Sequence, residues 1–251
     1  MGEIVQGFWA VILRDLKRIW AEPFRLVSGL AQPLLYLFLL GSGIGAATRI
    51  GGGEYLKYIF PGVVALSLLF TATFSAISIV FDRETGFLKA VLVAPVSRPS
   101  VAVGKVCSGA IQAMAQGILL LIFAPLIGIY FGPLQILLFV IFMILSGLVF
   151  SAMGVAVATN FSSTEVFPVV LNAVLLPMFF LSGALYPLNT APDWLQALSY
   201  VDPVAYGVDL MRGSIMGTFY YPEWLSVMVL FFLGFLLIWT AVKVFEKGEE
   251  I

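Results

Sequence analysis

Long uncharged apolar stretches alternate along this chain with shorter polar segments. Each stretch has about 20 residues or more, the length at which an α-helix crosses ~30 Å of hydrocarbon with a rise of 1.5 Å per residue. The longest uncharged stretch, 106–164, is divided at Gly132-Pro133, where we expect a very tight turn. The pattern predicts six transmembrane helices: 26–48, 58–81, 106–131, 134–158, 166–186 and 224–242.

Residues 1–25 follow a helical period instead of an unbroken apolar run. Apolar side chains such as Phe8, Ile12 and Leu16 fall on one side of the helix, and basic side chains such as Arg14 and Lys17 fall on the other. This pattern predicts an amphipathic helix that lies in the membrane interface, with its basic side facing water. Pro23 is expected to end the helix.

The longest polar interruption between two spans is the segment 82–105, DRETGFLKAVLVAPVSRPSVAVGK. Gly86 can end the helix that enters it, and the apolar residues at 87, 88, 91 and 92 have helical spacing. We therefore expect a short amphipathic helix in this loop, shaped to be held by another protein. The alternative is an ordinary positively charged connector between two spans.

The segment 187–223 is apolar and aromatic but is punctuated by glycine and proline. Pro192 predicts the start of one short helix, and Asp202-Pro203 predicts a second helix that runs to about Met216. These features predict a re-entrant helical hairpin between the fifth and sixth spans, on the outer side of the membrane. Asp209 and Arg212 are three residues apart and could pair on one helix face.

Composition agrees with a membrane protein. Of the 251 residues, 61% are hydrophobic and 11% charged, and the mean hydropathy is +1.05. A soluble domain of this size would have too little polar surface, so the fold class is an all-α integral membrane protein. With six spans, ten Lys and Arg residues fall on the side of the termini and the 82–105 loop, and three fall on the other side. The positive-inside rule therefore predicts that both termini are cytoplasmic.

The residues for several kinds of chemistry are missing from the sequence. The chain has no histidine and one cysteine, Cys107, so no internal disulfide can form. It has no metal-ligand cluster, no nucleophile–base pairing and no GxxxxGK[ST] phosphate loop. We therefore expect no enzyme activity and no cofactor in this chain, and any energy for work must come from another protein.

A polar stripe on the second span is the candidate wall of a transport route. It is formed by Ser67, Thr71, Ser75 and Ser78. The alternative is that these hydroxyls form hydrogen bonds between helices. Weaker candidates of the same type are Gln32 and Tyr36 on the first span and Asn172 on the fifth.

Two stretches carry a family resemblance: the 82–105 loop quoted above and LPMFFLSGALYPLNTAPDWLQALSYVDPVAYGVDLMRG at 176–213. With the span pattern, they resemble the type-2 ABC exporter permease family over nearly the whole chain, which would be a single transmembrane domain. The resemblance implies a prokaryotic inner-membrane permease that pairs with a second copy or a close paralogue. It also implies two separate ATP-binding subunits, which would hold ATP and Mg²⁺. Membrane lipid is the other expected partner, and nucleic acid is not expected.

The resemblance also assigns roles to residues of this chain. The loop after the second span would carry the coupling helix that docks in the ATP-binding subunit, and the hairpin would close the outer end. The coupling residues would be Asp82, Arg83, Glu84, Gly86, Phe87, Leu88 and Arg98, and the external gate Tyr186, Trp194, Asp209 and Arg212.

Short turns between spans favour a small amphipathic, drug-like or lipid-linked substrate, as in the drug-resistance and nodulation-export branch of the family. Phe179, Phe180 and Tyr186 could supply part of an aromatic route for a polysaccharide. The alternative function is a membrane scaffold or assembly factor that binds a cytoplasmic partner through the 82–105 loop without transporting anything.

Overall fold

The computed structural model describes residues 2–21, 23–43, 52–86 and 98–247, and this part of the chain contains helices and no strands. Within it, five segments are long and apolar enough to cross a membrane. The segments are Leu26–Gly43, Glu54–Glu84, Pro99–Leu121, Pro133–Ala158 and Glu223–Val244. The predicted fifth span corresponds to α10 (Val166–Leu181), a shorter apolar helix of 16 residues.

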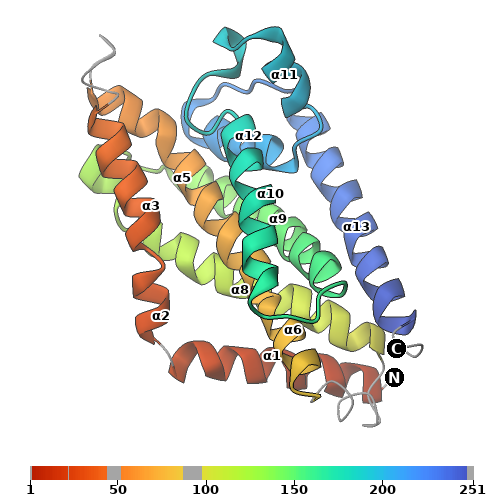
Figure 1. Cartoon of the computed structure of the whole chain (residues 1–251). Coiled ribbons are helices and arrows are strands. Elements are labelled where there is room, and N and C mark those ends of the chain that lie inside the picture. The colour runs from red at the N-terminus through yellow and green to blue at the C-terminus, as the bar shows by residue number, and fades with distance from the viewer. Residues whose placement is uncertain (1, 22, 44–51, 87–97, 248–251) are drawn as a thin grey trace.

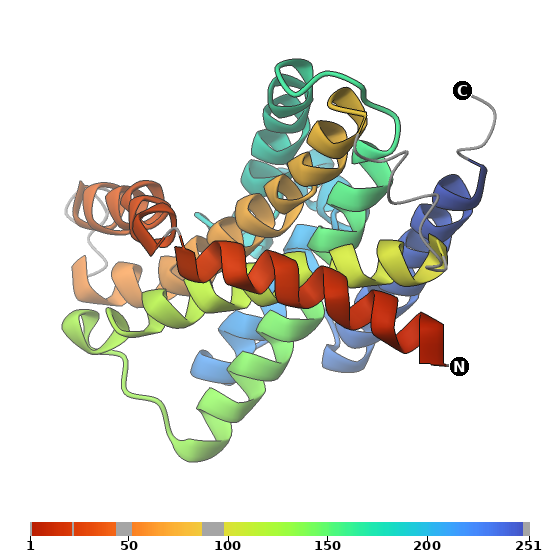
Figure 2. The same ribbon diagram turned by 90° about the horizontal axis from the view of Figure 1, so that it is seen from below.

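The first helix, α1 (Gly2–Ala21), lies across one end of the helical bundle (Figures 1 and 2). It packs along the beginning of α8 (Arg98–Leu121), where Val11 lies against Gly104 and Ile12 is buried. The end of α13 (Glu223–Lys247) lies at the same end of the molecule, which we call the α1 end.

The first predicted span is interrupted rather than continuous. It consists of α2 (Pro23–Ser28), α3 (Ala31–Leu35) and a π-helix, η1 (Tyr36–Leu40), with a turn at Gly29–Leu30. Pro33 has no N–H to donate to the carbonyl of Gly29, so one helical hydrogen bond is lost at the turn. Residues 44–48 of the predicted span lie outside the described residues.

The centre of the bundle is formed by α5 (Gly52–Ser75), which contacts α8 and α9 (Pro133–Ala158) along much of its length (Figure 1). After a turn at Ala76, α6 (Ile77–Glu84) continues it, so this helical segment is longer at both ends than the predicted span 58–81. Gly154 of α9 allows close approach, because a Cβ there would lie 2.5 Å from the backbone oxygen of Thr73.

The third helix begins and ends earlier than the predicted span 106–131. Helix α8 starts at Arg98 and ends at Leu121, and it is followed by a 3₁₀ helix, η2 (Ala124–Ile127). Pro125 explains the early end, since proline cannot continue an α-helix. The prediction of a very tight turn before the fourth span was wrong, because residues 122–132 connect α8 to α9.

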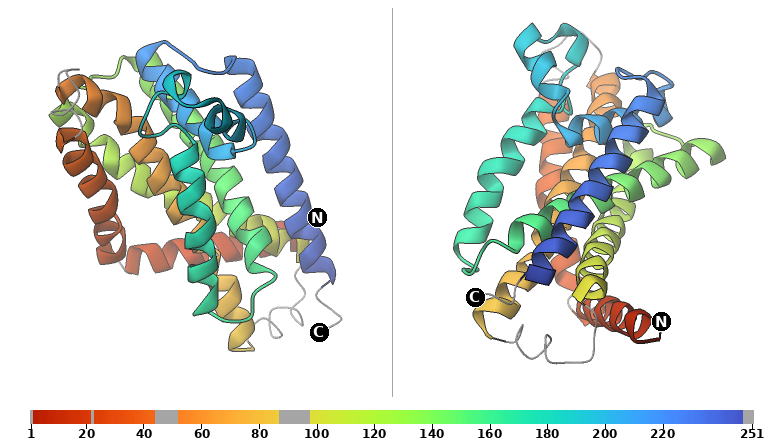
Figure 3. Two further views of the ribbon diagram at one scale, coloured as in Figure 1. Left: turned by 45° about the horizontal axis from the view of Figure 1, so that its top comes forward. Right: turned by 90° about the vertical axis from the view of Figure 1, so that its right-hand side faces the viewer.

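The opposite end of the molecule holds η3 (Leu188–Thr190), α11 (Asp193–Ser199) and α12 (Pro203–Met216) (Figures 1 and 3). Both predicted helix starts are confirmed. Pro192 directly precedes α11, and the Asp202 side chain caps α12 by accepting a hydrogen bond from the Val204 N–H, 2.9 Å away. Helix α12 is buried along most of its length, against α5, α9 and α13.

Candidate functional site

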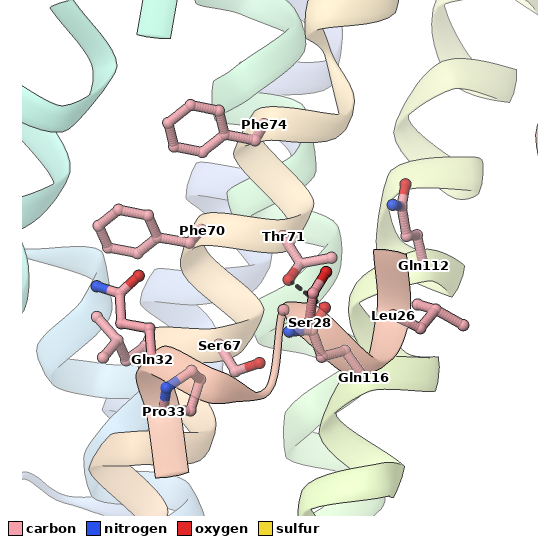
Figure 4. Close-up of a pocket in the computed structure, with 12 residues that line it drawn as sticks. Leu26, Ser28, Gln32, Pro33, Ser67, Phe70, Thr71, Phe74, Gln112 and Gln116 are labelled. Carbon is pink, nitrogen blue, oxygen red and sulfur yellow. Dashed lines mark hydrogen bonds between the residues drawn. The ribbon is translucent and has the colours of Figure 1, made fainter. Parts of the chain in front are cut away.

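A polar cavity of about 300 Å³ lies where the first span is interrupted, between this interruption, α5 and α8 (Figure 4). Irregular backbone at membrane depth is found where it is buried in protein or lines a cavity. The cavity is lined by Leu26, Ser28, Gly29, Gln32, Pro33, Leu66, Ser67, Phe70, Thr71, Phe74, Gln112 and Gln116.

One face of α5 supplies two hydroxyls and two aromatic rings to this cavity. Ser67, Phe70, Thr71 and Phe74 recur at a spacing of three and four residues, which places them on one side of a helix. The Phe70 and Phe74 rings are stacked, with centroids 5.9 Å apart. The Ser67 hydroxyl is buried and has no hydrogen-bond partner among the described residues.

Helix α8 supplies two amides, Gln112 and Gln116, which the sequence analysis missed. The Thr71 hydroxyl donates a hydrogen bond to Gln116 Oε1, 2.9 Å away, and so joins α5 to α8 across the cavity (Figure 4). Gln112 and Gln116 could have been predicted from the sequence, because they form a pair of amides four residues apart in an otherwise apolar span.

The other predicted route residues have different surroundings. Gln32 lines the cavity, but Tyr36 packs edge-on against Phe179 of α10, with ring centroids 6.2 Å apart. Ser75 bonds to the carbonyl of Ala72, and Ser78 takes part in bonding between helices. Asn172 lies exposed on α10, and it is not among the residues that line the cavity.

A second polar cluster lies at the α1 end and joins three helices. It consists of Arg14 and Asp15 on α1, Ser78 and Asp82 on α6, and Lys105 and Ser108 on α8; we call it the polar joint.

Lys105 is the centre of the polar joint and is only 4% exposed. Its Nζ donates to Ser78 Oγ at 2.7 Å and lies 3.5 Å from Asp15 Oδ2 and 3.8 Å from Asp82 Oδ2. Arg14 pairs with the same two carboxylates, at 3.3 Å from Asp15 and 3.4 Å from Asp82. Two positive and two negative charges thus balance one another at the junction of α1, α6 and α8.

The residues after Asp82 bind the connection between α9 and α10. Arg83 donates a hydrogen bond to the carbonyl of Phe161, and Glu84 accepts hydrogen bonds from the N–H and the hydroxyl of Thr164, at 3.2 and 2.6 Å. Asp82, Arg83 and Glu84, which were predicted to couple to a partner, therefore also form contacts with other residues of this chain. They fix the end of α6 to α1, α8 and the 161–164 segment.

The remaining predicted coupling residues can be placed only in part. Gly86 has a left-handed backbone (φ 74°) just beyond the end of α6, as expected of a glycine that ends a helix. Phe87 and Leu88 lie outside the described residues, as does the short helix predicted there. Arg98 is the first residue of α8.

Comparison with known proteins identifies the family. Residues 6–216 match the family model described as "ABC-2 type transporter". The chain belongs to this family. Its members include transport permeases, the membrane components of ABC transporters, and this chain is a permease with several helices that could span a membrane.

Several named proteins are similar to this permease over most of their length. Nodulation protein J of Rhizobium leguminosarum bv. viciae is 30% identical over 214 residues, covering 83% of this chain and 82% of that protein. The inner membrane transport permease YadH of Escherichia coli K12 is 27% identical over 249 residues, covering 95% and 94%. The transport permease ycf38 of Cyanophora paradoxa is 29% identical over 238 residues, covering 92% and 80%.

The end of the permease opposite the α1 end is stabilised by two buried residues of α12, Asp209 and Arg212, whose spacing in the sequence would allow them to pair. No direct ion pair joins Asp209 and Arg212 in the described part of the chain, although their charges attract each other. Arg212 stacks over the Tyr58 ring at 3.9 Å and donates to the carbonyls of Gly183 and Ala184, at 2.9 and 3.3 Å. Backbone acceptors at the end of α10 take the place of the carboxylate.

The other predicted gate residues do not converge on one opening. Asp209 accepts hydrogen bonds from the backbone N–H groups of Tyr220 and Tyr221, at 2.8 and 3.0 Å, and so fixes the chain before α13. The Tyr186 hydroxyl donates to the carbonyl of Phe180, and Trp194 is 61% exposed on α11.

Asp202 gives a testable pH dependence. Burial raises the pKa of its carboxyl to about 7, against the effect of the Val204 N–H, and its Oδ2 has no hydrogen-bond partner among the described residues. The folded permease therefore binds a proton at this site more tightly than the unfolded chain does. The resulting stability is fully present below the ordinary pKa of 3.8 and is lost as pH rises through about 7.

Asp202→Asn keeps an oxygen for the helix cap but cannot ionise. We expect the stability of the variant relative to the wild type to rise by on the order of 1 kcal/mol between pH 4 and pH 8, because only the wild type has to ionise a buried carboxyl. The effect stays this small because structural relaxation relieves much of the cost of burying the charge. Thermal unfolding in detergent at a series of pH values measures this difference. A difference that stays constant with pH would contradict a buried, titrating Asp202.

Proposed function

We propose that the permease is the membrane half of an ATP-driven exporter, which moves a small amphipathic, drug-like or lipid-linked substrate, or a polysaccharide, out of the cell. The observation that carries this proposal is the polar cavity at an interrupted span. Transporter binding sites commonly use discontinuous helices near the middle of the membrane. The cavity residues 67–74 lie near the middle of the segment Glu54–Glu84.

The same helical segment connects the cavity to the polar joint. It supplies Ser67 and Thr71 to the cavity and Asp82, Arg83 and Glu84 to the contacts at its end. A displacement applied to the 82–105 loop would therefore act on the wall of the cavity through a packed helix. A non-transporting scaffold would need the loop but would have no use for such a cavity.

Six spans and cytoplasmic termini form part of this proposal. Helix α10 has 16 residues and a length of ~24 Å, slightly less than the hydrocarbon thickness, so residues 182–186 would complete the fifth span. The excess of Lys and Arg at the α1 end supports a cytoplasmic position for this end. Helices α11 and α12 would then form the outer, re-entrant region.

Pairing with a second copy, or a close paralogue, is supported by the exposed face of α10. Val169 is 69% exposed there, and the exposed amide of Asn172 lies between apolar neighbours. An amide that faces lipid has no hydrogen-bond partner, so burial against a second permease is favoured.

The ATP-binding subunits, two per dimer, would supply the energy and hold ATP and Mg²⁺. They would dock on the cytoplasmic 82–105 loop, including the residues Phe87, Leu88 and Arg98. Family membership supports this partner, because ABC-2 permeases are the membrane components of ABC transporters.

Co-expression tests this function directly. A tagged permease in cell membranes is expected to co-purify with a separate subunit that carries a phosphate-binding loop and hydrolyses ATP. Deletion of residues 87–97 should release this subunit and leave the permease in the membrane. A permease that transports amphiphiles in vesicles without any ATP-binding subunit would contradict the proposal.

A further inference from the structure

We propose that the cavity between the interrupted first span, α5 and α8 binds the uncharged, hydrogen-bonding head of an amphipathic molecule. This inference rests on the proposed function in one respect, that the bound molecule is cargo. The binding chemistry itself depends only on the residues of the cavity.

The described lining of the cavity is uncharged. None of the twelve described residues that line the cavity carries a charge. The nearest cation on α8, Lys105, is seven residues before Gln112, about 10 Å along the helix, and it is already paired in the polar joint. An ionised head would lose its hydration in the cavity and gain no countercharge from the described residues that line it, so it is disfavoured.

The cavity also presents several groups that can donate and accept hydrogen bonds. Each glutamine offers both a donor and an acceptor, and Gln32, Gln112 and Gln116 approach the cavity from two helices. The Thr71 hydroxyl holds the Gln116 amide in one orientation. A ligand with hydroxyl or amide groups can therefore exchange hydrogen bonds with the glutamine amides of this cavity.

The apolar wall and the volume of the cavity further define the class of ligand that fits. The stacked rings of Phe70 and Phe74 and the side chains of Leu26 and Leu66 offer an apolar surface beside the amides. A volume of about 300 Å³ lies at the lower end of the range for ligand pockets, enough for one ring or a short polyol but not for a whole lipid. The cavity therefore fits a neutral polyol or amide head, with the alkyl chain of the ligand outside it.

Three probes that each carry a ten-carbon chain test this selectivity: N-decanoyl-N-methylglucamine, decyl phosphate and decyltrimethylammonium. Binding is measured by calorimetry on the full-length permease in phosphatidylcholine nanodiscs, since this host lipid has no hydrogen-bond donor in its head. We expect the neutral probe to bind at least 10-fold more tightly than either charged probe. Equal binding of the three probes, or no binding of the neutral one, would overturn the inference.

Variants of Gln116 locate the binding. Gln116→Leu should weaken binding of the neutral probe by about 5- to 10-fold, the effect of losing hydrogen bonds to one amide. Gln116→Glu has the same shape and should shift the preference towards decyltrimethylammonium. The matched control is Asn189→Leu, which removes an exposed amide of η3 outside the cavity and should leave binding unchanged. Equal losses in Gln116→Leu and Asn189→Leu would place the site elsewhere.

A second readout separates this inference from the export function. In the complex with its ATP-binding subunit, the neutral probe should stimulate ATP hydrolysis. Selective binding without stimulation would support the site and contradict the export role, whereas stimulation that Gln116→Glu leaves unchanged would contradict the site.

Discussion

Lys105→Met is expected to destabilise the permease by about 3 kcal/mol, because it leaves Asp15 and Asp82 partly buried with Arg14 as their remaining positively charged partner in the polar joint. For a chain of this size the loss corresponds to a fall of roughly 10 °C in Tm. Methionine fills a similar volume, so the effect reports the charge rather than packing. Thermal unfolding of the purified permease in detergent measures it.

Two further variants show whether the loss comes from the polar joint. Lys17→Met removes an exposed charge from α1 and should change Tm by no more than about 2 °C. Adding Asp15→Asn to Lys105→Met restores the charge balance between Arg14 and Asp82, so the double variant should recover part of the loss. A Tm for Lys105→Met equal to that of Lys17→Met would show that the polar joint contributes nothing.

Gly154→Ala is expected to cost about 3 kcal/mol or to prevent folding, although it adds a single methyl group to a helix. The new Cβ would lie 2.5 Å from the backbone oxygen of Thr73 and 2.7 Å from its Cα. Backbone atoms cannot rotate away as a side chain does, so α5 and α9 would have to separate. The yield of monodisperse protein and its Tm measure the effect.

Gly43→Ala is the matched control, because a Cβ at Gly43 would meet no heavy atom within 4 Å. Its stability should stay within about 0.5 kcal/mol of the wild type. Normal folding of Gly154→Ala would mean that α5 and α9 are farther apart than the structure shows.

The sequence predicts best those elements whose signals are local. The fourth span, predicted for 134–158, corresponds to α9 because Gly132-Pro133 marks its start, and Asp202-Pro203 marks the start of α12 in the same way. The early end of α8 was also signalled locally, by Pro125, but the continuous hydrophobicity of the segment hid it.

Features that depend on contacts between distant segments could not be predicted. Of the four hydroxyls predicted to form a stripe on the second span, only Ser67 and Thr71 line the cavity. Helix α8 presents Gln112 and Gln116 at their level and Lys105 at the level of Ser78. The first span also approaches α8 closely at its interruption, because a Cβ at Gly29 would lie 2.6 Å from Gln116 Nε2.

The contacts between the charged residues of the polar joint could not be predicted for the same reason. The charges of Arg14, Asp15, Asp82 and Lys105 are visible in the sequence, and any of them could have faced water or a partner protein. They are brought together where α1 and α6 both meet the start of α8. A motif can therefore mark such residues as important without revealing that they bind within the chain.

We expect a displacement of the ATP-binding subunit to reach the cavity through the end of α6. A distance measured across the cavity tests this prediction. Spin labels at Leu35→Cys on α3 and Ile111→Cys on α8, both exposed positions beside the cavity, are introduced in a Cys107→Ser background. Pulsed electron paramagnetic resonance on the complex with its ATP-binding subunit should show a distance that changes when ATP binds. Glu84→Lys cannot accept the hydrogen bonds from Thr164 and should abolish the change while ATP hydrolysis continues. A distance that ATP leaves unchanged in the wild type, or that changes equally in Glu84→Lys, would contradict this mechanism.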